Sequence, residues 1–249
     1  MARTTSPEEK TSNDWEAIES SPFAGAYIEE MYWLSRDTAE TCQGIFENTP
    51  APPQASSYIR VDHGLHRELY RVLNNAARIR ALIKSRPKGK SQGAAMYALQ
   101  ERRIKWLAGL LADLPTAQVL HSKVRNTLEH FDEYLDETAL KSRRSQISRP
   151  TIFPVDVILG REGTLEQFDV GGSSPTVYPL RVYLAEERVF VNCGARLDLD
   201  AISNECRGIT ERLESIAPHL ADHPVDGGDR GSSMLIVTDQ SFKGAAAEG

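Results

Sequence analysis

Three side chains that could carry out chemistry stand close together in the segment KVRNTLEHFDEYLDE, which covers residues 123–137. Arg125 and Asn126 are adjacent, and His130 follows five residues after the arginine. An imidazole titrates near neutral pH and can accept or donate a proton. A guanidinium presents a fixed fork of donors to phosphate or carboxylate oxygens. The segment therefore has two interpretations, a solvated and charged helix face or a site that binds an anion and transfers a proton.

The helix that must position these residues is predicted over about 117–140. Its apolar side chains share one narrow sector of the helical wheel, which faces the core, and they are Leu120, Val124, Leu128, Phe131 and Leu135. Asn126 and His130 lie on the opposite side, one turn apart. Arg125 flanks them at about 140° from His130. One helix does not aim both side chains at one atom, so a bent arginine side chain or a second helix would have to close the gap.

The composition of the chain bounds the class of protein. Its 249 residues are 40% hydrophobic, which allows a packed core, and the formal net charge of -6 argues against a protein that coats nucleic acid over its whole surface. Three cysteines without CxxC spacing argue against a disulfide framework or a zinc ribbon and favour a reducing compartment. Since we find neither a signal peptide nor an apolar run of about 18 residues, we expect a cytoplasmic protein without membrane contact.

Apolar residues at three- and four-residue steps predict three further helices before the one that carries the motif. These helices cover about 15–47, 57–85 and 94–112. The second has a clean apolar stripe, which consists of Leu65, Leu69, Val72, Leu73, Ala76, Ile79, Leu82 and Ile83. The third has an apolar face, which consists of Met96, Leu99, Ile104, Leu107 and Leu111. Helices joined by short breaks predict an antiparallel bundle over residues 15–149, after a disordered tail at 1–14.

The segment 150–217 has a different character, because Val, Ile, Phe and Tyr become frequent. VYLAEERVFV predicts two strands around a turn at 186–187. A last helix is predicted over about 201–216 with Asp200 as its N-cap, and its apolar positions are Ile202, Cys206, Ile209, Leu213 and Ile216. These elements are too small for a separate core and are expected to pack on the bundle, while 218–249 is expected to form a flexible tail. The predicted fold is mainly α: an antiparallel four- to five-helix bundle with a small β-hairpin extension and a C-terminal helix.

The six residues from Arg125 to His130 resemble the R-x4-H motif of HEPN domains, in the common form with asparagine after the arginine. The setting is similar too, because that motif lies on a late helix of an all-helical bundle. The resemblance implies a HEPN-like bundle in which the motif helices of two protomers face each other and form a composite site for metal-independent RNA cleavage. It also implies a homodimer, a toxin or phage-defence setting, and a protein partner such as an antitoxin.

The resemblance assigns a role to each motif residue. His130 acts as general base or acid toward the ribose 2′-OH, Arg125 binds the phosphate, and Asn126 positions the imidazole or the phosphate. Neither a metal ion nor a cofactor is expected. Further candidates for binding phosphate or RNA are His121, Lys84, Arg86, Lys141, Arg143 and Arg144. The basic clusters that contain most of them also have a simpler interpretation, because cations near helix C-termini interact favourably with the helix dipole.

Acidic residues around the motif keep other functions open. They are Glu129, Asp132, Glu133 and Asp136, which would repel RNA and which suit a solvated helix face. The alternative function is a HEPN-like scaffold without activity that binds a partner protein or a nucleotide. A third is a bundle with a chance motif, in which the strand-rich segment carries the function.

One group of residues on the second predicted helix has spacings known from metal sites. Asp62, His63 and His66 could bring two imidazoles together on one helix face. A structural zinc ion needs four ligands, and no third and fourth ligand accompany the two imidazoles. We therefore predict an ordinary surface at this position.

Overall fold

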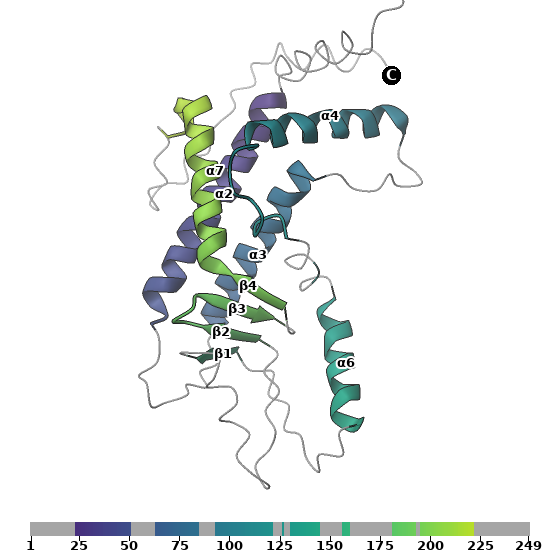
Figure 1. Cartoon of the computed structure of the whole chain (residues 1–249), viewed down its shortest axis with the longest axis vertical. Helices are drawn as coiled ribbons and strands as arrows, with labels where there is room; N and C mark the ends of the chain where they lie inside the picture. The colour runs from purple at the N-terminus through teal and green to yellow at the C-terminus, as the bar shows by residue number, and fades with distance from the viewer. Residues whose placement is uncertain are drawn as a thin grey trace, which may run out of the picture.

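The computed structural model describes residues 23–50, 63–84, 93–121, 126, 130–144, 156–159, 181–192 and 195–221. The helices within these residues are α2 (Phe23–Asn48), α3 (His63–Ile83), α4 (Ala94–Leu110), α6 (Phe131–Arg144), α7 (Leu199–Ile216) and the short 3-10 helix η3 (Pro218–Leu220). The strands are β1 (Asp156–Leu159), β2 (Arg181–Leu184), β3 (Val189–Asn192) and β4 (Ala195–Asp198). This part of the chain is mainly α-helical with a small sheet, as the sequence predicts (Figure 1). The predicted tails lie outside the described residues, apart from η3 and the residue that follows it.

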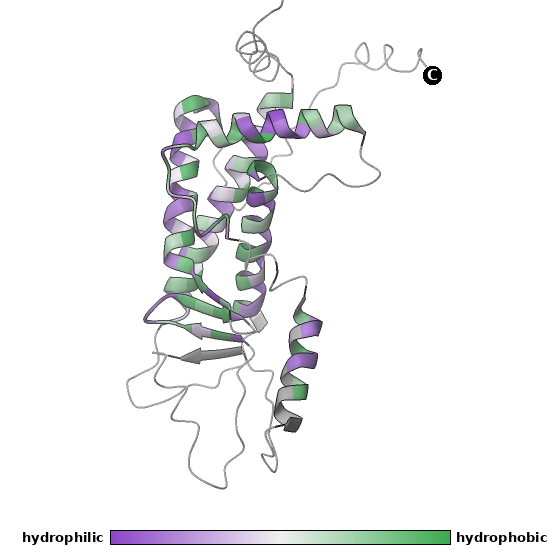
Figure 2. Ribbon diagram, turned by 45° about the vertical axis from the view of Figure 1, so that its right-hand side comes forward, coloured by the Kyte–Doolittle hydropathy of each residue, from purple (hydrophilic) through white to green (hydrophobic). Residues whose placement is uncertain are grey.

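Three long helices pack side by side, with α2 in contact with both α3 and α7 (Figure 1). The apolar stripe predicted for α3 is confirmed, because its buried residues are Leu65, Leu69, Val72, Leu73, Ala76, Ile79 and Ile83. Hydrophobic and hydrophilic residues alternate along each of the three helices (Figure 2), as expected where one face packs and the other meets water. None of the described helices is both long and apolar enough to cross a membrane.

The last helix belongs to this layer, because α7 packs along α2 and shares its core. Its buried apolar residues include four that the sequence predicts, Ile202, Cys206, Ile209 and Leu213. A polar contact continues the pairing toward the far end of α7, where the Tyr32 hydroxyl donates to Glu214 Oε1 at 3.1 Å. Ile216 is 44% exposed and ends the apolar stripe.

The N-cap of α7 is Asp198 and not the predicted Asp200. The Asp198 carboxylate accepts a hydrogen bond from the backbone N of Ala201 at 2.9 Å, which satisfies a donor of the first helical turn. Asp200 instead accepts from Arg188 Nη1 at 2.6 Å. The prediction was wrong by two residues because both aspartates precede Ile202, the first apolar position of the predicted stripe. Only Asp198, at the end of β4, has the extended backbone that a cap needs.

The small sheet covers the end of the helix layer where α2 ends and α7 begins (Figure 1). The predicted hairpin is confirmed: β2 and β3 pair antiparallel, with Tyr183 opposite Phe190, and Arg188 takes a positive φ of 52° in the turn. β1 pairs parallel with β2, and β4 pairs antiparallel with β3. Tyr183, Phe190 and Leu197 are buried in the same core as the helices, so sheet and helices form one packed unit.

The helix α4 crosses the opposite end of the layer (Figure 1). The Arg103 guanidinium lies 5.3 Å from the centre of the Tyr27 ring on α2 and donates to the Ala81 carbonyl of α3 at 3.4 Å. The apolar face predicted for this helix is buried only in part, because Leu107 and Leu111 are buried whereas Met96 and Leu99 are 55% and 51% exposed. The helix packs through its C-terminal part, and its first turns extend past the bundle end.

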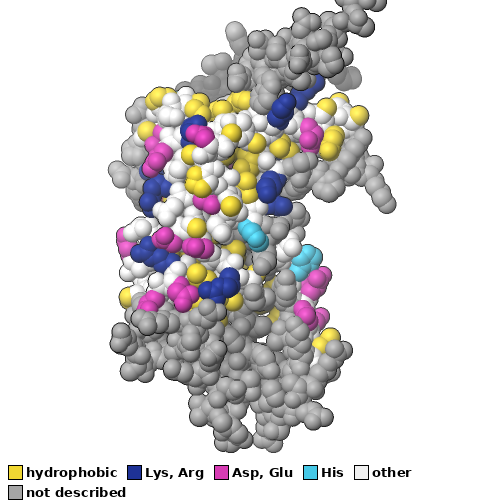
Figure 3. Space-filling view, in the orientation of Figure 1, with side chains coloured by type: hydrophobic (Ala, Val, Ile, Leu, Met, Phe, Trp, Pro, Cys, Tyr) yellow, Lys and Arg dark blue, Asp and Glu magenta, His cyan; other side chains and the backbone are white. Residues whose placement is uncertain are grey.

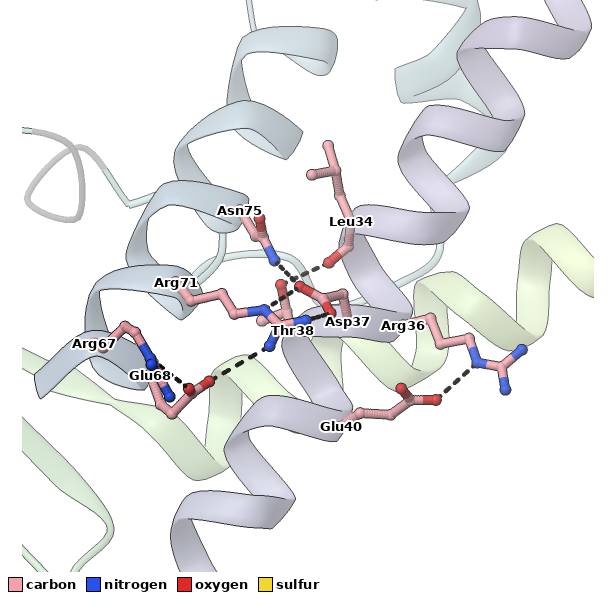
Figure 4. A network of polar contacts seen from close by, with 9 residues as sticks. All are labelled: Leu34, Arg36, Asp37, Thr38, Glu40, Arg67, Glu68, Arg71 and Asn75. Atoms are coloured by element: carbon pink, nitrogen blue, oxygen red, sulfur yellow. Dashed lines mark hydrogen bonds and ion pairs between the residues drawn. The ribbon is translucent and has the colours of Figure 1, made fainter. Parts of the chain in front are cut away.

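A polar network fixes α2 against α3 (Figure 4). Asp37 accepts from Arg71 Nε at 2.8 Å, from a second nitrogen of the same guanidinium, and from Asn75 Nδ2 at 2.7 Å. Glu68 lies 3.5 Å from the other side of Arg71. Because Asn75 is buried and Arg71 binds in bidentate geometry, the network sets the register of the two helices in addition to the apolar contacts.

Two cysteine thiols, Cys42 on α2 and Cys206 on α7, are fully buried in this core. Burial raises the pKa of the Cys42 thiol to about 12 and raises the pKa of Cys206 above its ordinary range. In the unfolded chain these thiols ionise near pH 8.5, about the ordinary value. Both therefore stay neutral in the folded state and act as small apolar packing groups.

The free energy of unfolding is expected to fall as the pH rises above about 9. The unfolded chain then loses thiol protons that the folded chain keeps, so each thiol lowers stability by up to about 1.4 kcal/mol per pH unit until the pH reaches its folded pKa. Urea unfolding between about pH 8 and pH 10 measures this slope. In Cys42→Ala the slope of the free energy of unfolding against pH should become shallower by the contribution of one thiol. An unchanged slope in that variant would refute the conclusion that the Cys42 thiol stays protonated in the folded state.

Candidate functional site

The segment that carries the motif is interrupted where the sequence predicts one continuous helix. Residues 117–120 form a turn, Asn126 is helical, His130 is in a turn, and α6 begins at Phe131. The predicted helix over 117–140 is therefore not continuous among the described residues. Arg125 lies outside them, so the structure places two of the three motif residues.

Asn126 and His130 stand one helical turn apart, as predicted. The backbone N of His130 donates to the carbonyl of Asn126 at 3.1 Å, and both residues are exposed. His130 Nδ1 lies 3.1 Å from Glu133 Oε1, and 46% of the histidine side chain is exposed. A carboxylate that accepts from Nδ1–H fixes the imidazole and leaves Nε2 as the atom that can take up a proton.

The acidic residues near His130 have a structural role as well. Asp132 and Glu133 lie in the first turn of α6, where negative charge is favourable beside the positive end of the helix dipole. Asp136 and Glu137 are also exposed. On the face drawn in Figure 3, acidic and basic side chains are interspersed among the described residues. Among the described residues, the basic side chains on this face do not form a continuous track.

A buried carboxylate holds the segment that leads to the motif. Glu205 of α7 is only 7% exposed, and its two oxygens accept from the backbone N of Gln118, at 3.0 Å each, and from that of Val119 at 2.8 Å. On the other side of this turn, Arg80 of α3 donates from Nε to the carbonyl of Leu120 at 3.0 Å. Both ends of the turn are thus anchored to the helix layer, and the anchors position the chain just before the motif.

Of the other predicted phosphate-binding residues, Lys84 and His121 are the two whose side chains belong to the described part of the chain. Lys84 follows the last turn of α3, near α4, and that end of α3 stands apart from α6 in Figures 1 and 2. His121 is exposed and follows the anchored turn. Arg86 lies outside the described residues, and Lys141, Arg143 and Arg144 belong to the last turn of α6, where only the backbone is described.

The end of α3 carries a basic cluster that includes Arg78, Arg80 and Lys84. Two of its arginines have structural partners. Arg78 forms an ion pair with Glu30 of α2, and Arg80 binds the Leu120 carbonyl as described above. These contacts explain part of the cluster by packing between elements. The sequence analysis had explained these cations by the helix dipole alone. It could not identify Glu30 or the Leu120 carbonyl as partners, because both are far from the arginines in sequence.

Arg181, His66 and Phe131 lie in contact beside the motif, although the sequence analysis did not place them together. Arg181 Nη1 lies 2.7 Å from His66 Nε2, and its guanidinium carbon lies 5.2 Å from the centre of the Phe131 ring. His66 had been considered only as a metal ligand. Among the described residues, no group of three or more His, Cys, Asp or Glu could hold a metal ion. Arg181 gave no signal in the sequence, because an arginine that begins a strand is common.

Comparison with protein-family models, with curated proteins and with solved structures found no match for this chain. The interpretation of the site therefore depends on its residues, their geometry and the resemblance of the motif.

Proposed function

We propose that this protein is a HEPN-like, metal-independent endoribonuclease that acts as a homodimer in the cytoplasm. The observation that supports the proposal most directly is the geometry around His130: an exposed imidazole whose Nδ1 lies 3.1 Å from a carboxylate, one turn after Asn126. In that arrangement Nε2 points away from its carboxylate partner and can reach a substrate. The resemblance of the motif supplies the substrate class.

The proposed reaction transfers one proton at each end of a phosphodiester. His130 Nε2 takes the proton of the ribose 2′-OH, and the 2′-oxygen attacks the adjacent phosphorus. The bond from phosphorus to the 5′-oxygen breaks, and that oxygen takes a proton from an imidazolium. The products are a 2′,3′-cyclic phosphate and a free 5′-OH. Arg125 stabilises the charge that develops on the phosphate oxygens, and Asn126 orients the reacting groups.

The homodimer follows from the incompleteness of one motif helix. Arg125 and His130 are about 140° apart on the predicted helix, so one copy does not aim both at one phosphorus atom. Two copies of this segment related by a two-fold axis would supply the imidazole of one protomer and the guanidinium of the other. In such a dimer the second imidazole is also available to protonate the leaving oxygen.

Cleavage of single-stranded RNA of mixed sequence in the presence of EDTA tests the proposal. We expect products that end in 2′,3′-cyclic phosphate, no effect of EDTA, and no cleavage of DNA of the same sequence, because DNA lacks the 2′-OH. Light scattering on the same sample should give about twice the chain mass of 27.7 kDa. A requirement for magnesium, or cleavage of the DNA control, would overturn the mechanism. A monomer in the presence of RNA would overturn the composite site.

A scaffold without activity that binds a partner protein is the second candidate, and a groove between α2 and α3 favours it. The groove has a volume of about 460 Å³, and its charged lining residues are Asp37, Glu40, Arg67, Glu68 and Arg71. Three carboxylates against two guanidinium groups suit a basic side chain of a protein better than the phosphate of a nucleotide. If no RNA is cleaved under any condition, this candidate replaces the first.

A further inference from the structure

Phe131, the residue directly after His130, lies outside the core, although the sequence predicts it there. The helical wheel places its side chain in the sector that faces the core. In the structure the ring is only partly buried, and among the described residues it neither belongs to the core nor packs against it. The helix that it begins, α6, runs beside the packed unit in Figures 1 and 2. A partly exposed aromatic ring therefore lies next to the imidazole.

A contact with the sheet orients this ring. The guanidinium carbon of Arg181 lies 5.2 Å from the ring centre, and Arg181 Nη1 lies 2.7 Å from His66 Nε2 on α3. Arg181 is itself partly buried, so packing holds the group on which the ring lies. An aromatic ring has two faces, and no other ring or cation of the described residues lies over Phe131. The guanidinium thus fixes the ring and occupies one face of it.

A fixed, partly exposed ring beside a site for RNA cleavage fits a nucleic-acid base. Bases that are splayed out of a single strand stack on aromatic side chains, and stacking tolerates any sequence because every base has a π face. We propose that Phe131 stacks on a base of the RNA strand, in a nucleotide next to the phosphodiester that His130 cleaves. This inference rests on the proposed function. It adds a residue that binds a base to a site otherwise composed of groups that bind phosphate or transfer a proton.

Stacking has different consequences from a role in docking α6 on the sheet. Stacking needs an aromatic ring, whereas docking needs apolar volume, which leucine largely keeps. Phe131→Leu should therefore raise KM and leave kcat nearly unchanged, because it removes binding without touching the proton transfer. Phe131→Tyr keeps the π face and should resemble the unmodified protein. If Phe131 merely held α6 in place, its loss would displace His130 and lower kcat.

Two strands of equal length and equal charge test the inference separately from cleavage. The first is a fluorescently labelled single-stranded 2′-O-methyl RNA, which lacks the nucleophilic hydroxyl. The second carries abasic tetrahydrofuran residues in place of every nucleoside and keeps the phosphates. Anisotropy measures the affinity for both. For Phe131→Leu we expect the affinity for the first strand to fall about tenfold and that for the abasic strand to stay unchanged.

Phe46→Leu is the matched control, because Phe46 on α2 is also partly buried and also lies under a guanidinium, that of Arg188 at 4.5 Å. This variant should bind both strands like the unmodified protein. The inference is overturned by an unchanged affinity of Phe131→Leu for the first strand, by an equal loss on both strands, by an equal loss in Phe46→Leu or Phe131→Tyr, or by no binding of the first strand to the unmodified protein.

The outcomes for binding and cleavage are distinguishable. If Phe131 sets the affinity that depends on bases but no RNA is cleaved, the stacking contact stands and the nuclease proposal fails. If RNA is cleaved but the affinity is independent of Phe131, the nuclease proposal stands and this inference fails. Should Phe131→Leu not fold, the NMR signals of the Phe131 ring protons in the unmodified protein replace it. Saturation with the first strand should shift them upfield through the ring current of the stacked base. Signals that do not move, or that move equally with the abasic strand, would overturn the inference.

Discussion

His130→Ala is expected to abolish RNA cleavage and to leave the fold intact. Removal of a general base lowers the rate by about 10²- to 10⁴-fold. The side chain is 46% exposed, and its described partner is the exposed Glu133, so its loss opens no cavity in the core. Product formation followed over time on single-stranded RNA measures the loss, and circular dichroism and thermal unfolding should match the unmodified protein.

His219→Ala is the matched control for this variant, because His219 is also an exposed histidine but lies in η3 after α7. It should retain full activity. Cleavage that persists at the original rate in His130→Ala would remove the imidazole from the mechanism. Equal losses in both variants would show that the assay reports stability and not chemistry.

Glu205→Ala is expected to give the largest loss of stability among single substitutions in the anchored turn. Glu205 is only 7% exposed, and its carboxylate accepts hydrogen bonds from the backbone N–H groups of Gln118 and Val119. The substitution removes this carboxylate and leaves both donors without it. Buried donors left without a partner cost free energy, and the bonds lost are charge-assisted, so we expect a decrease of about 3 kcal/mol in the free energy of unfolding. Urea unfolding monitored by circular dichroism measures it.

Two further variants separate the role of Glu205 from a general effect of changing α7. Glu205→Gln keeps one acceptor oxygen and should lose less than the alanine variant. Glu211→Ala changes an exposed glutamate on the same helix and should shift the free energy by less than about 0.5 kcal/mol. A loss in Glu205→Ala no larger than that in Glu211→Ala would show that the backbone donors find other partners.

Periodicity predicted the elements whose packing is uniform along their length. The stripe of α3 was found because every third or fourth side chain faces the same core, and the hairpin of β2 and β3 was found because β-branched and aromatic residues flank a polar turn. Periodicity did not predict how much of α4 is buried. Met96 and Leu99 have the spacing of a buried helix face, but they extend past the helices that would cover them. Spacing shows which face is apolar, and only the arrangement of the other helices decides how far that face is covered.

The candidate site was predictable only where it is local in sequence. Asn126 and His130 lie one turn apart on one segment, so their spacing was enough to place them together. Glu205 carried a signal that was overlooked, because an acidic residue three positions after Ile202 and four before Ile209 lies on the buried stripe of α7. The contact of Arg181 with His66 joins residues 115 positions apart and depends on how the sheet docks on α3. No local pattern predicts such a pair.

The pairing of α2 with α7 has a consequence for how the chain is made. Tyr32 and Glu214, which form a hydrogen bond with each other, are 182 positions apart, so the part of α2 that packs on α7 stays uncovered until α7 has been made. Ribosomes release the N-terminal part first, and contacts of such long sequence separation form late. The turn before the motif is likewise anchored only after Glu205 has emerged. A nascent or truncated chain that has exposed His130 but not α7 therefore lacks the support of the motif, which confines an assembled site to finished molecules.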